Sequence, residues 1–176
     1  GYDDPSGVTD PDLGAGVNIF LAGDSTVKDY GASGMYQGGK PSNEGSWGEF
    51  LQNYFNSDLV TVVNYANGGR SCRSFINEGR LDTIAANISE GDFLLIQFGH
   101  NDCANDKAYR EDRYVPLGTP DANGVYPVTP GVKNDKGVYT WDCGGTYKWF
   151  LQQYIDVAKN AGATPVLGTP VARMYY

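Results

Sequence analysis

The sequence predicts an α/β protein built on a parallel β-sheet, and two observations lead to this prediction. Short apolar runs typical of buried strands alternate along the chain with longer stretches that have the spacing of amphipathic helices. The apolar runs are followed by glycine-containing turns. Strands that alternate with helices pair in parallel through right-handed crossovers, so we expect helices on both faces of the sheet.

Four strands and three helices are expected. The strands are apolar or rich in β-branched residues, and they span residues 17–22, 60–66, 92–98 and 164–169. The helices have apolar residues three and four positions apart, and they span residues 47–55, 74–88 and 147–161. Before the first helix, Ser46 is a candidate N-cap, and Glu49 would complete a capping box.

The chain divides into an N-terminal arm, residues 1–16, and a single domain, residues 17–176. Within the domain, residues 103–144 form a long insertion with few helical signals and many Gly, Pro and Tyr residues. The aromatic residues of this insertion either form a wall of the substrate cleft or belong to a surface excursion. Cys103 and Cys143 bracket the insertion, and they either form a disulfide or are two unrelated thiols.

Composition and charge exclude several classes of protein. The chain has 13 Lys and Arg against 21 Asp and Glu and no basic stripe, so we expect no nucleic-acid partner. Its apolar runs are far shorter than the ~20 residues that a membrane span needs, so we expect no membrane partner. Few Lys, many Tyr, Gly, Asn and Thr, and a glycosylation sequon at Asn87 favour a secreted protein whose signal peptide has been removed.

Polar residues follow the first three expected strands at the point where each strand ends. The segments are Gly-Asp-Ser-Thr at 23–26, Asn-Gly-Gly-Arg-Ser at 67–71 and Gly-His-Asn-Asp at 99–102. Because ligands bind outside the carboxyl ends of the strands in open parallel sheets, these segments should meet at one site. A serine hydroxyl can attack a carbonyl, while a backbone N–H and an amide NH2 hold the resulting oxyanion. Each segment alone is an ordinary turn, but together they predict acyl transfer, with candidate catalytic residues Ser25, Gly69 and Asn101.

These segments resemble the first three sequence blocks of the SGNH (GDSL) hydrolases. More narrowly, residues 21–26, 69–74, 78–80 and 98–102 resemble the rhamnogalacturonan acetylesterases of the family 12 carbohydrate esterases. The resemblance implies a flavodoxin-like three-layer α/β/α fold with strand order 2-1-3-4-5. It also implies that Ser25 is the nucleophile and that its own N–H, the Gly69 N–H and the Asn101 side chain form the oxyanion hole. No metal or organic cofactor is implied.

The activity that the resemblance implies is removal of acetyl groups from a plant cell-wall polysaccharide through an acyl-serine intermediate. Rhamnogalacturonan is the favoured substrate, and acetylated xylan is the next. Two other functions stay open: a lipase or thioesterase of the wider SGNH group, which would need an apolar groove, and a non-catalytic carbohydrate-binding relative.

The sequence departs from the family because it lacks the C-terminal Asp-x-x-His block that carries the family's catalytic base. Its single histidine, His100, lies in the third block beside Asn101. Because side chains alternate along an extended segment, His100 should point away from the site if Asn101 points into it. We therefore expect a second chain or a C-terminal fragment to supply a fifth strand and the catalytic Asp and His.

Several residues near the three segments have two interpretations. Asp24 and Asp102 are expected to brace their loops rather than to take part in the chemistry. Arg70 and Arg73 would either bind an acidic sugar or tie loops together. Trp47 would either stack on a sugar ring or pack in the core, and we expect core packing.

Overall fold

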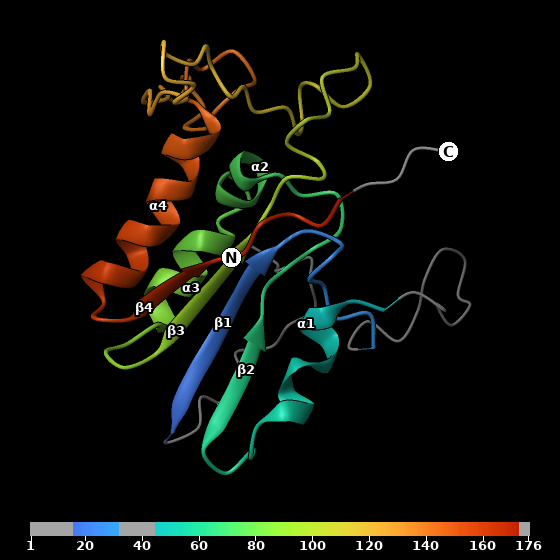
Figure 1. Ribbon diagram of the computed structural model, residues 1–176, viewed down its shortest axis with the longest axis vertical. Coiled ribbons are helices and arrows are strands. Elements are labelled where there is room, and N and C mark those ends of the chain that lie inside the picture. Colours follow the sequence, from blue (N-terminus) through green and yellow to red (C-terminus); the bar gives the residue numbers. More distant parts are fainter. Residues whose placement is uncertain (1–15, 32–44, 173–176) are drawn as a thin grey trace.

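A parallel four-stranded sheet forms the centre of the protein. The computed structural model describes residues 16–31 and 45–172, and every structural statement below concerns these residues. The strand order is β2-β1-β3-β4, and the strands are β1 (Val17–Gly23), β2 (Val60–Asn64), β3 (Phe93–Gln97) and β4 (Thr164–Leu167). The predicted α/β fold and strand order are confirmed (Figure 1). The expected N-terminal arm lies outside the described residues except for its last residue.

Helices cover both faces of this sheet, which gives three layers (Figure 1). One face carries the short helix α1 (Trp47–Phe50) and the 3-10 helix η1 (Leu51–Tyr54). The other face carries α2 (Cys72–Asn77), α3 (Arg80–Asn87) and α4 (Tyr147–Asn160). The core follows these layers, because alternate side chains of a strand point to opposite faces of the sheet. Phe20 and Ala22 pack with α2, α3 and α4, whereas Ile19 and Leu21 pack on the side of η1.

The single helix predicted over residues 74–88 is wrong, because the chain turns between α2 and α3. Gly79 stands at this turn with φ of 75°, a left-handed conformation that glycine adopts without a side-chain clash. Glu78 beside it pairs with both Arg70 and Arg80, which ties the turn to the segment before α2.

The helix predicted over residues 47–55 is also shorter and less buried than expected. The Ser46 hydroxyl donates to the Lys28 carbonyl (2.7 Å) and makes no side-chain cap, so the predicted capping box is wrong. A Cβ at Gly48 would lie 2.0 Å from the Val27 carbonyl oxygen, so α1 packs closely on the loop that follows β1. As a result its apolar residues are largely exposed, and Trp47 is 37% exposed rather than in the core.

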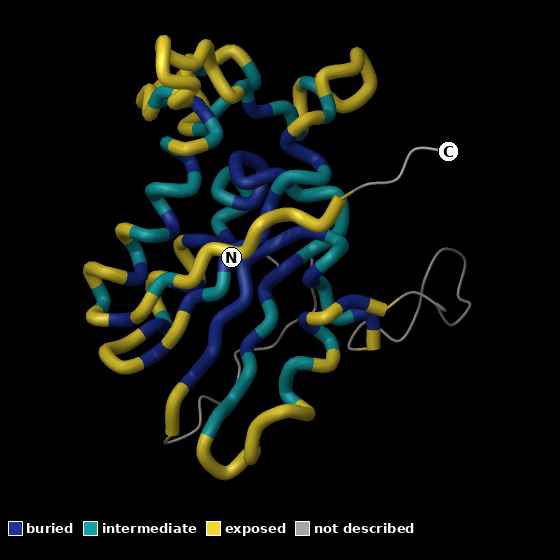
Figure 2. The backbone as a smooth tube through the Cα atoms, viewed as in Figure 1, coloured by how far each residue is buried: buried dark blue, intermediate teal, exposed yellow. Residues whose placement is uncertain are grey.

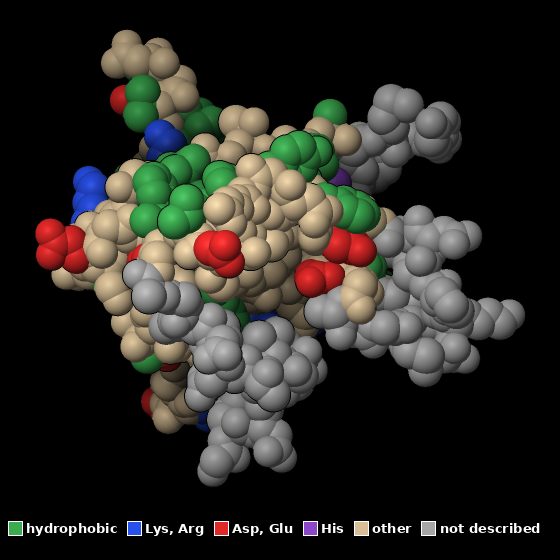
Figure 3. Space-filling model, turned by 90° about the horizontal axis from the view of Figure 1, so that it is seen from below, with side chains coloured by type: hydrophobic (Ala, Val, Ile, Leu, Met, Phe, Trp, Pro, Cys, Tyr) green, Lys and Arg blue, Asp and Glu red, His purple; other side chains and the backbone are tan. Residues whose placement is uncertain are grey.

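Exposure is concentrated in the insertion, along β4, and at the end of the molecule where the strands begin (Figure 2). In β4, Val166 is 42% and Leu167 52% exposed, because β4 pairs on only one side, with β3. Hydrophobic side chains, among acidic ones, gather on the end opposite the insertion (Figure 3). Of the helices described, none has both the length and the apolar character required to cross a membrane.

Candidate active site

The three segments that follow β1, β2 and β3 meet at the carboxyl edge of the sheet. The parallel register pairs Gly23 with Gln97 at the ends of β1 and β3, and it pairs Leu21 with Asn64 at the end of β2, so the three strands end within two residues of the same level. The first two segments touch: the Asn67 N–H donates to the Gly23 carbonyl (3.1 Å). A Cβ at Gly68 would lie only 3.9 Å from the Ser25 Cβ. The structure therefore places Ser25 beside the glycine pair, as the strand order predicts.

The turn that carries Ser25 is held by its neighbours. Asp24 is buried, and one carboxylate oxygen accepts both the backbone N–H and the hydroxyl of Thr26, each at 2.8 Å. The Tyr30 hydroxyl donates to the Ser25 carbonyl (2.9 Å). Asp24 thus braces this loop, as expected, while Ser25 itself stays half-buried and accessible.

The backbone N–H groups of Ser25 and Gly69 lack an acceptor within the described residues. Gly68, in contrast, donates its N–H to the Asn67 side chain (3.0 Å). Gly69 has φ of 76°, and a Cβ there would lie 3.0 Å from Nη2 of Arg113. The left-handed backbone conformation favours glycine, and a Cβ at this position would displace the end of the Arg113 side chain. Unpaired N–H groups beside a serine are what an oxyanion hole needs.

The Asn101 side chain joins the third segment to the second. It is buried, its Nδ2 donates to the Arg70 carbonyl (3.1 Å), and its Oδ1 accepts a hydrogen bond from Nη1 of Arg113 (3.4 Å). Because the amide group carries two hydrogens, one of them has no partner within the described residues. Ser25, Gly69 and Asn101 thus lie on three adjoining segments that contact one another.

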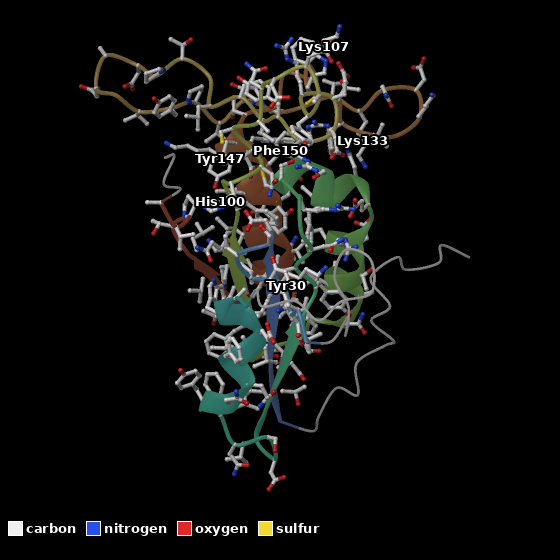
Figure 4. All side chains as sticks on the ribbon, turned by 90° about the vertical axis from the view of Figure 1, so that its right-hand side faces the viewer. Tyr30, His100, Lys107, Lys133, Tyr147 and Phe150 are labelled. Atoms are coloured by element: carbon white, nitrogen blue, oxygen red, sulfur yellow. The ribbon has the colours of Figure 1, made fainter. Side chains whose placement is uncertain are left out.

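His100 points toward the opposite edge of the sheet. Its Nε2 lies 2.7 Å from the carbonyl of Val171, which follows β4, whereas Asn101 turns toward the β2 side. Since a carbonyl only accepts, Nε2 carries the hydrogen of this bond. Figure 4 shows His100 below the insertion, at the level where the strands end. Within the described residues no side chain hydrogen-bonds to Ser25 Oγ.

Asp102 supports the start of α2 rather than the reacting groups. Its Oδ1 accepts the Cys72 N–H (2.8 Å), and its Oδ2 has no hydrogen-bond partner. Burial, together with the negative charge of Asp24, raises the pKa of Asp102 to about 6. Burial beside this carboxylate also raises the pKa of the Cys72 thiol, so Cys72 is a buried thiol of low reactivity.

Arg73 ties the insertion to α2. Its side chain is buried and donates to four backbone carbonyls of the insertion, those of Arg110 (3.4 Å), Glu111 (3.0 Å), Tyr114 (3.2 Å) and Tyr139 (2.7 Å). Burial lowers the pKa of this guanidinium. Arg70 pairs with Glu78. The loop-tying interpretation of both arginines is therefore the one that the structure supports.

The start of the insertion forms one wall of a pocket beside Asn101. This pocket has a volume of about 720 Å³, and its lining residues are His100, Asn101, Cys103, Ala104, Asn105, Asp106, Tyr109 and Arg113. Tyr109 is the aromatic residue of the insertion that lines this pocket, while residues 117–126 are exposed. Cys103 and Cys143 are free thiols, so no disulfide closes the insertion. Within the described residues, no group of His, Cys, Asp and Glu side chains could hold a metal ion.

Arg113 is a site residue that the sequence reasoning missed, whereas Tyr109 is one of the aromatic residues of the insertion that it considered for a wall of the cleft. They lie in a stretch without periodicity, and Arg113 reaches Asn101 and Gly69 only through the path of the insertion. Trp47 was expected in the core but donates its Nε1–H to Gln97 (2.5 Å) at the end of β3. No pattern in the sequence around Arg113 or Trp47 predicts these contacts.

A serine after the first strand of a parallel sheet, beside unpaired N–H donors, is the arrangement of hydrolases that pass through an acyl-serine intermediate. Comparison with known proteins identifies the family of this chain. It belongs to the GDSL-like lipase/acylhydrolase family, whose sequence profile matches residues 19–161.

Two curated relatives come from Bacillus subtilis. The chain is 38% identical over 159 residues to the probable rhamnogalacturonan acetylesterase YesY, covering 90% of this chain and 56% of the relative. It is 36% identical over 160 residues to the rhamnogalacturonan acetylesterase RhgT, covering 89% of this chain and 50% of the relative. The chain thus spans about half the length of these relatives. The crystal structure of B. subtilis YxiM has the same fold, with a TM-score of 0.59 and 24% identity over 91% of this chain and 34% of YxiM.

Proposed function

We propose that this protein is a carbohydrate acetylesterase that removes acetyl groups from acetylated rhamnogalacturonan, a pectic polysaccharide of the plant cell wall. The observation that carries the proposal is the pair of unpaired backbone N–H groups, those of Ser25 and Gly69, next to the Asn101 amide. The names of the two relatives at 36–38% identity support rhamnogalacturonan as the substrate. Acetylated xylan is the second substrate to test.

The proposed reaction has two steps. The Ser25 hydroxyl attacks the acetyl carbonyl, its proton passes to a base, and the N–H donors of Ser25, Gly69 and Asn101 stabilise the oxyanion. The intermediate collapses to acetyl-Ser25, and the sugar leaves as its alcohol after taking up the proton. Water then attacks the acetyl group with the same assistance, which releases acetate and restores the serine.

The catalytic base is the part of this proposal that needs further polypeptide. A serine hydroxyl is a weak nucleophile without an adjacent base, and His100, the only histidine of the chain, is turned toward Val171. We propose that a catalytic Asp and His come from polypeptide outside these 176 residues, either a continuation of the chain or a separate segment. The exposed edge at β4 supports a further strand there.

A secreted location belongs to the same proposal. The proposed substrate is a polymer outside the cell, and the low lysine content and the sequon at Asn87 agree with secretion. Asn87 lies at the end of α3 and is partly exposed, so its side chain is within reach of solvent.

Replacement of Ser25 by alanine tests the proposed function. We expect Ser25→Ala to lower acetate release from acetylated rhamnogalacturonan by about 1,000-fold or more in the protein together with any companion segment. The matched control is Ser57→Ala, in the exposed turn before β2, which should leave release unchanged. Unchanged release by Ser25→Ala would exclude Ser25 as the nucleophile.

A panel of substrates separates the proposal from its alternatives. Acetate release from the pectic polymer and from a small acetyl ester, with little activity on long-chain fatty-acyl esters, is expected. A preference for long acyl chains would indicate a lipase or thioesterase. Binding of the polymer without any Ser25-dependent acetate release would indicate a carbohydrate-binding protein.

A further inference from the structure

The guanidinium group of Arg113 is held from several directions at the edge of the candidate site. Its Nη1 donates to Oδ1 of Asn101 (3.4 Å), and its Nε donates to the carboxylate of Asp112 (3.1 Å). The planar group lies over the Tyr109 ring, 4.4 Å from the ring centre. On another side Nη2 occupies the space that a side chain at Gly69 would need. Arg113 thus contacts two of the three candidate catalytic segments.

The backbone that carries Arg113 is also fixed. The Arg113 N–H donates to the Tyr109 carbonyl (2.8 Å), which closes a helical turn. Carbonyl groups just before and after it, including those of Glu111 and Tyr114, accept hydrogen bonds from buried Arg73 of α2. The position of Arg113 relative to Gly69 and Asn101 is therefore set by α2 and not by a free loop.

The hydrogen-bonding chemistry of the Arg113 guanidinium and of the Arg70 carbonyl determines how the Asn101 carboxamide is oriented. A guanidinium group can only donate hydrogen bonds, so the atom of Asn101 that faces Arg113 must be the amide oxygen. The Arg70 carbonyl can only accept, so the atom that faces it must be the NH2 group. A 180° flip of the carboxamide would place donor against donor and acceptor against acceptor. The two partners together select one of two orientations.

Without Arg113, the bond to the Arg70 carbonyl would be the one hydrogen bond from the described residues that opposes this flip. A donor aimed at a developing oxyanion must be held in place before the reaction, because reorientation during the reaction adds to the barrier. The positive charge on Arg113 also strengthens the hydrogen bond to Oδ1 and polarises the amide, which makes the NH2 group a better donor. Asp112 only partly offsets this charge, because its carboxylate is 60% exposed to water.

We propose that Arg113 is a positioning residue: it fixes the orientation of the Asn101 carboxamide, and the insertion thereby completes the oxyanion hole. The inference rests on the proposed function of Asn101 as an oxyanion donor. It assigns the beginning of the insertion a part in the chemical step on every acetyl ester, whether or not the substrate is a polymer.

The first test needs no enzymatic activity. In protein labelled with ¹⁵N-asparagine, the side-chain NH2 signals of Asn101 are identified by their loss in Asn101→Ala. We expect the ¹H–¹⁵N heteronuclear NOE of these signals to fall clearly in Arg113→Met and to recover in part in Arg113→Lys. Arg110→Met, a control in the same insertion whose guanidinium lies over Trp141, should leave them unchanged. An equally ordered Asn101 side chain in Arg113→Met would overturn the proposal.

The second test is a double-mutant cycle on a small neutral acetyl ester, measured with any companion segment present. We expect Arg113→Met to lower kcat about tenfold when Asn101 is present, with little change in KM, and by twofold or less in the Asn101→Ala background. Equal losses in both backgrounds would show that Arg113 does not act through Asn101. A loss seen only on an acidic polymer would show contact with the substrate, and this too would overturn the proposal. If no Ser25-dependent turnover exists, the proposed function fails, and the NMR test still decides whether Arg113 orients Asn101.

Discussion

Replacing Asp102 by asparagine should flatten the pH dependence of stability between about pH 4 and pH 7. Asp102 is buried under the site, and only one of its carboxylate oxygens has a hydrogen-bond partner, the Cys72 N–H. The amide oxygen of an asparagine can accept the same hydrogen bond, so the substitution removes the charge and preserves the contact. Asp102→Asn therefore isolates the effect of burying a carboxylate.

The size and sign of the effect follow from the pKa of Asp102. Burial raises this pKa from 3.8 to about 6, so between these values the folded protein binds more protons than the unfolded chain. The free energy of unfolding contributed by this group therefore falls as the pH rises through this window. The full loss corresponds to at most about 3 kcal/mol, is reached above the folded pKa, and is absent below about pH 4.

Urea unfolding at several pH values measures this contribution. The free energy of unfolding of Asp102→Asn relative to wild type should increase by up to about 3 kcal/mol between pH 4 and pH 7. The new NH2 group adds a cost that does not depend on pH, so it drops out of the slope. Asp135→Asn, in an exposed turn of the insertion, serves as the control and should follow the wild-type profile. Parallel profiles for Asp102→Asn and wild type would refute the reasoning.

Two further substitutions test the site and its support. Gly69→Ala should lower kcat about tenfold or more and destabilise the protein by about 1 kcal/mol or more, because it displaces the Arg113 guanidinium in addition to straining the backbone. Gly124→Ala has a similar positive φ and open space around it, so it measures the backbone strain alone and should leave kcat unchanged. Equal kcat values for Gly69→Ala and Gly124→Ala would contradict the placement of Gly69 in the active site. Arg73→Met should cost about 3 kcal/mol in urea unfolding and speed proteolysis within residues 103–144, because it leaves carbonyls of the insertion without donors. Arg70→Met, which breaks a partly exposed ion pair, should cost less. Equal protease resistance of Arg73→Met and wild type would argue against this role.

Local pattern and the geometry of parallel sheets were enough to predict the central part of this protein. The apolar runs identify the strands, most clearly β1 and β3, because a strand covered on both faces needs continuous apolar side chains. Parallel pairing then brings the carboxyl ends of neighbouring strands to one edge, so Ser25, Gly69 and Asn101 could be assigned to one site before any contact was known. The outward direction of His100 followed from alternation along an extended segment.

Contacts between residues far apart in the chain were decided only by the tertiary structure. Ser46 has the sequence context of a helix cap, yet its hydroxyl binds the Lys28 carbonyl, because α1 packs against the loop after β1. Arg73 could bind a sugar or a loop, and only the path of the insertion, which brings four carbonyls to it, decides between them. The path of the insertion also brings Arg113 to Asn101. Sequence periodicity records which face of a helix or strand is buried. It carries no information on which irregular segment folds over that face, because the path of such a segment depends on the packing of the whole domain.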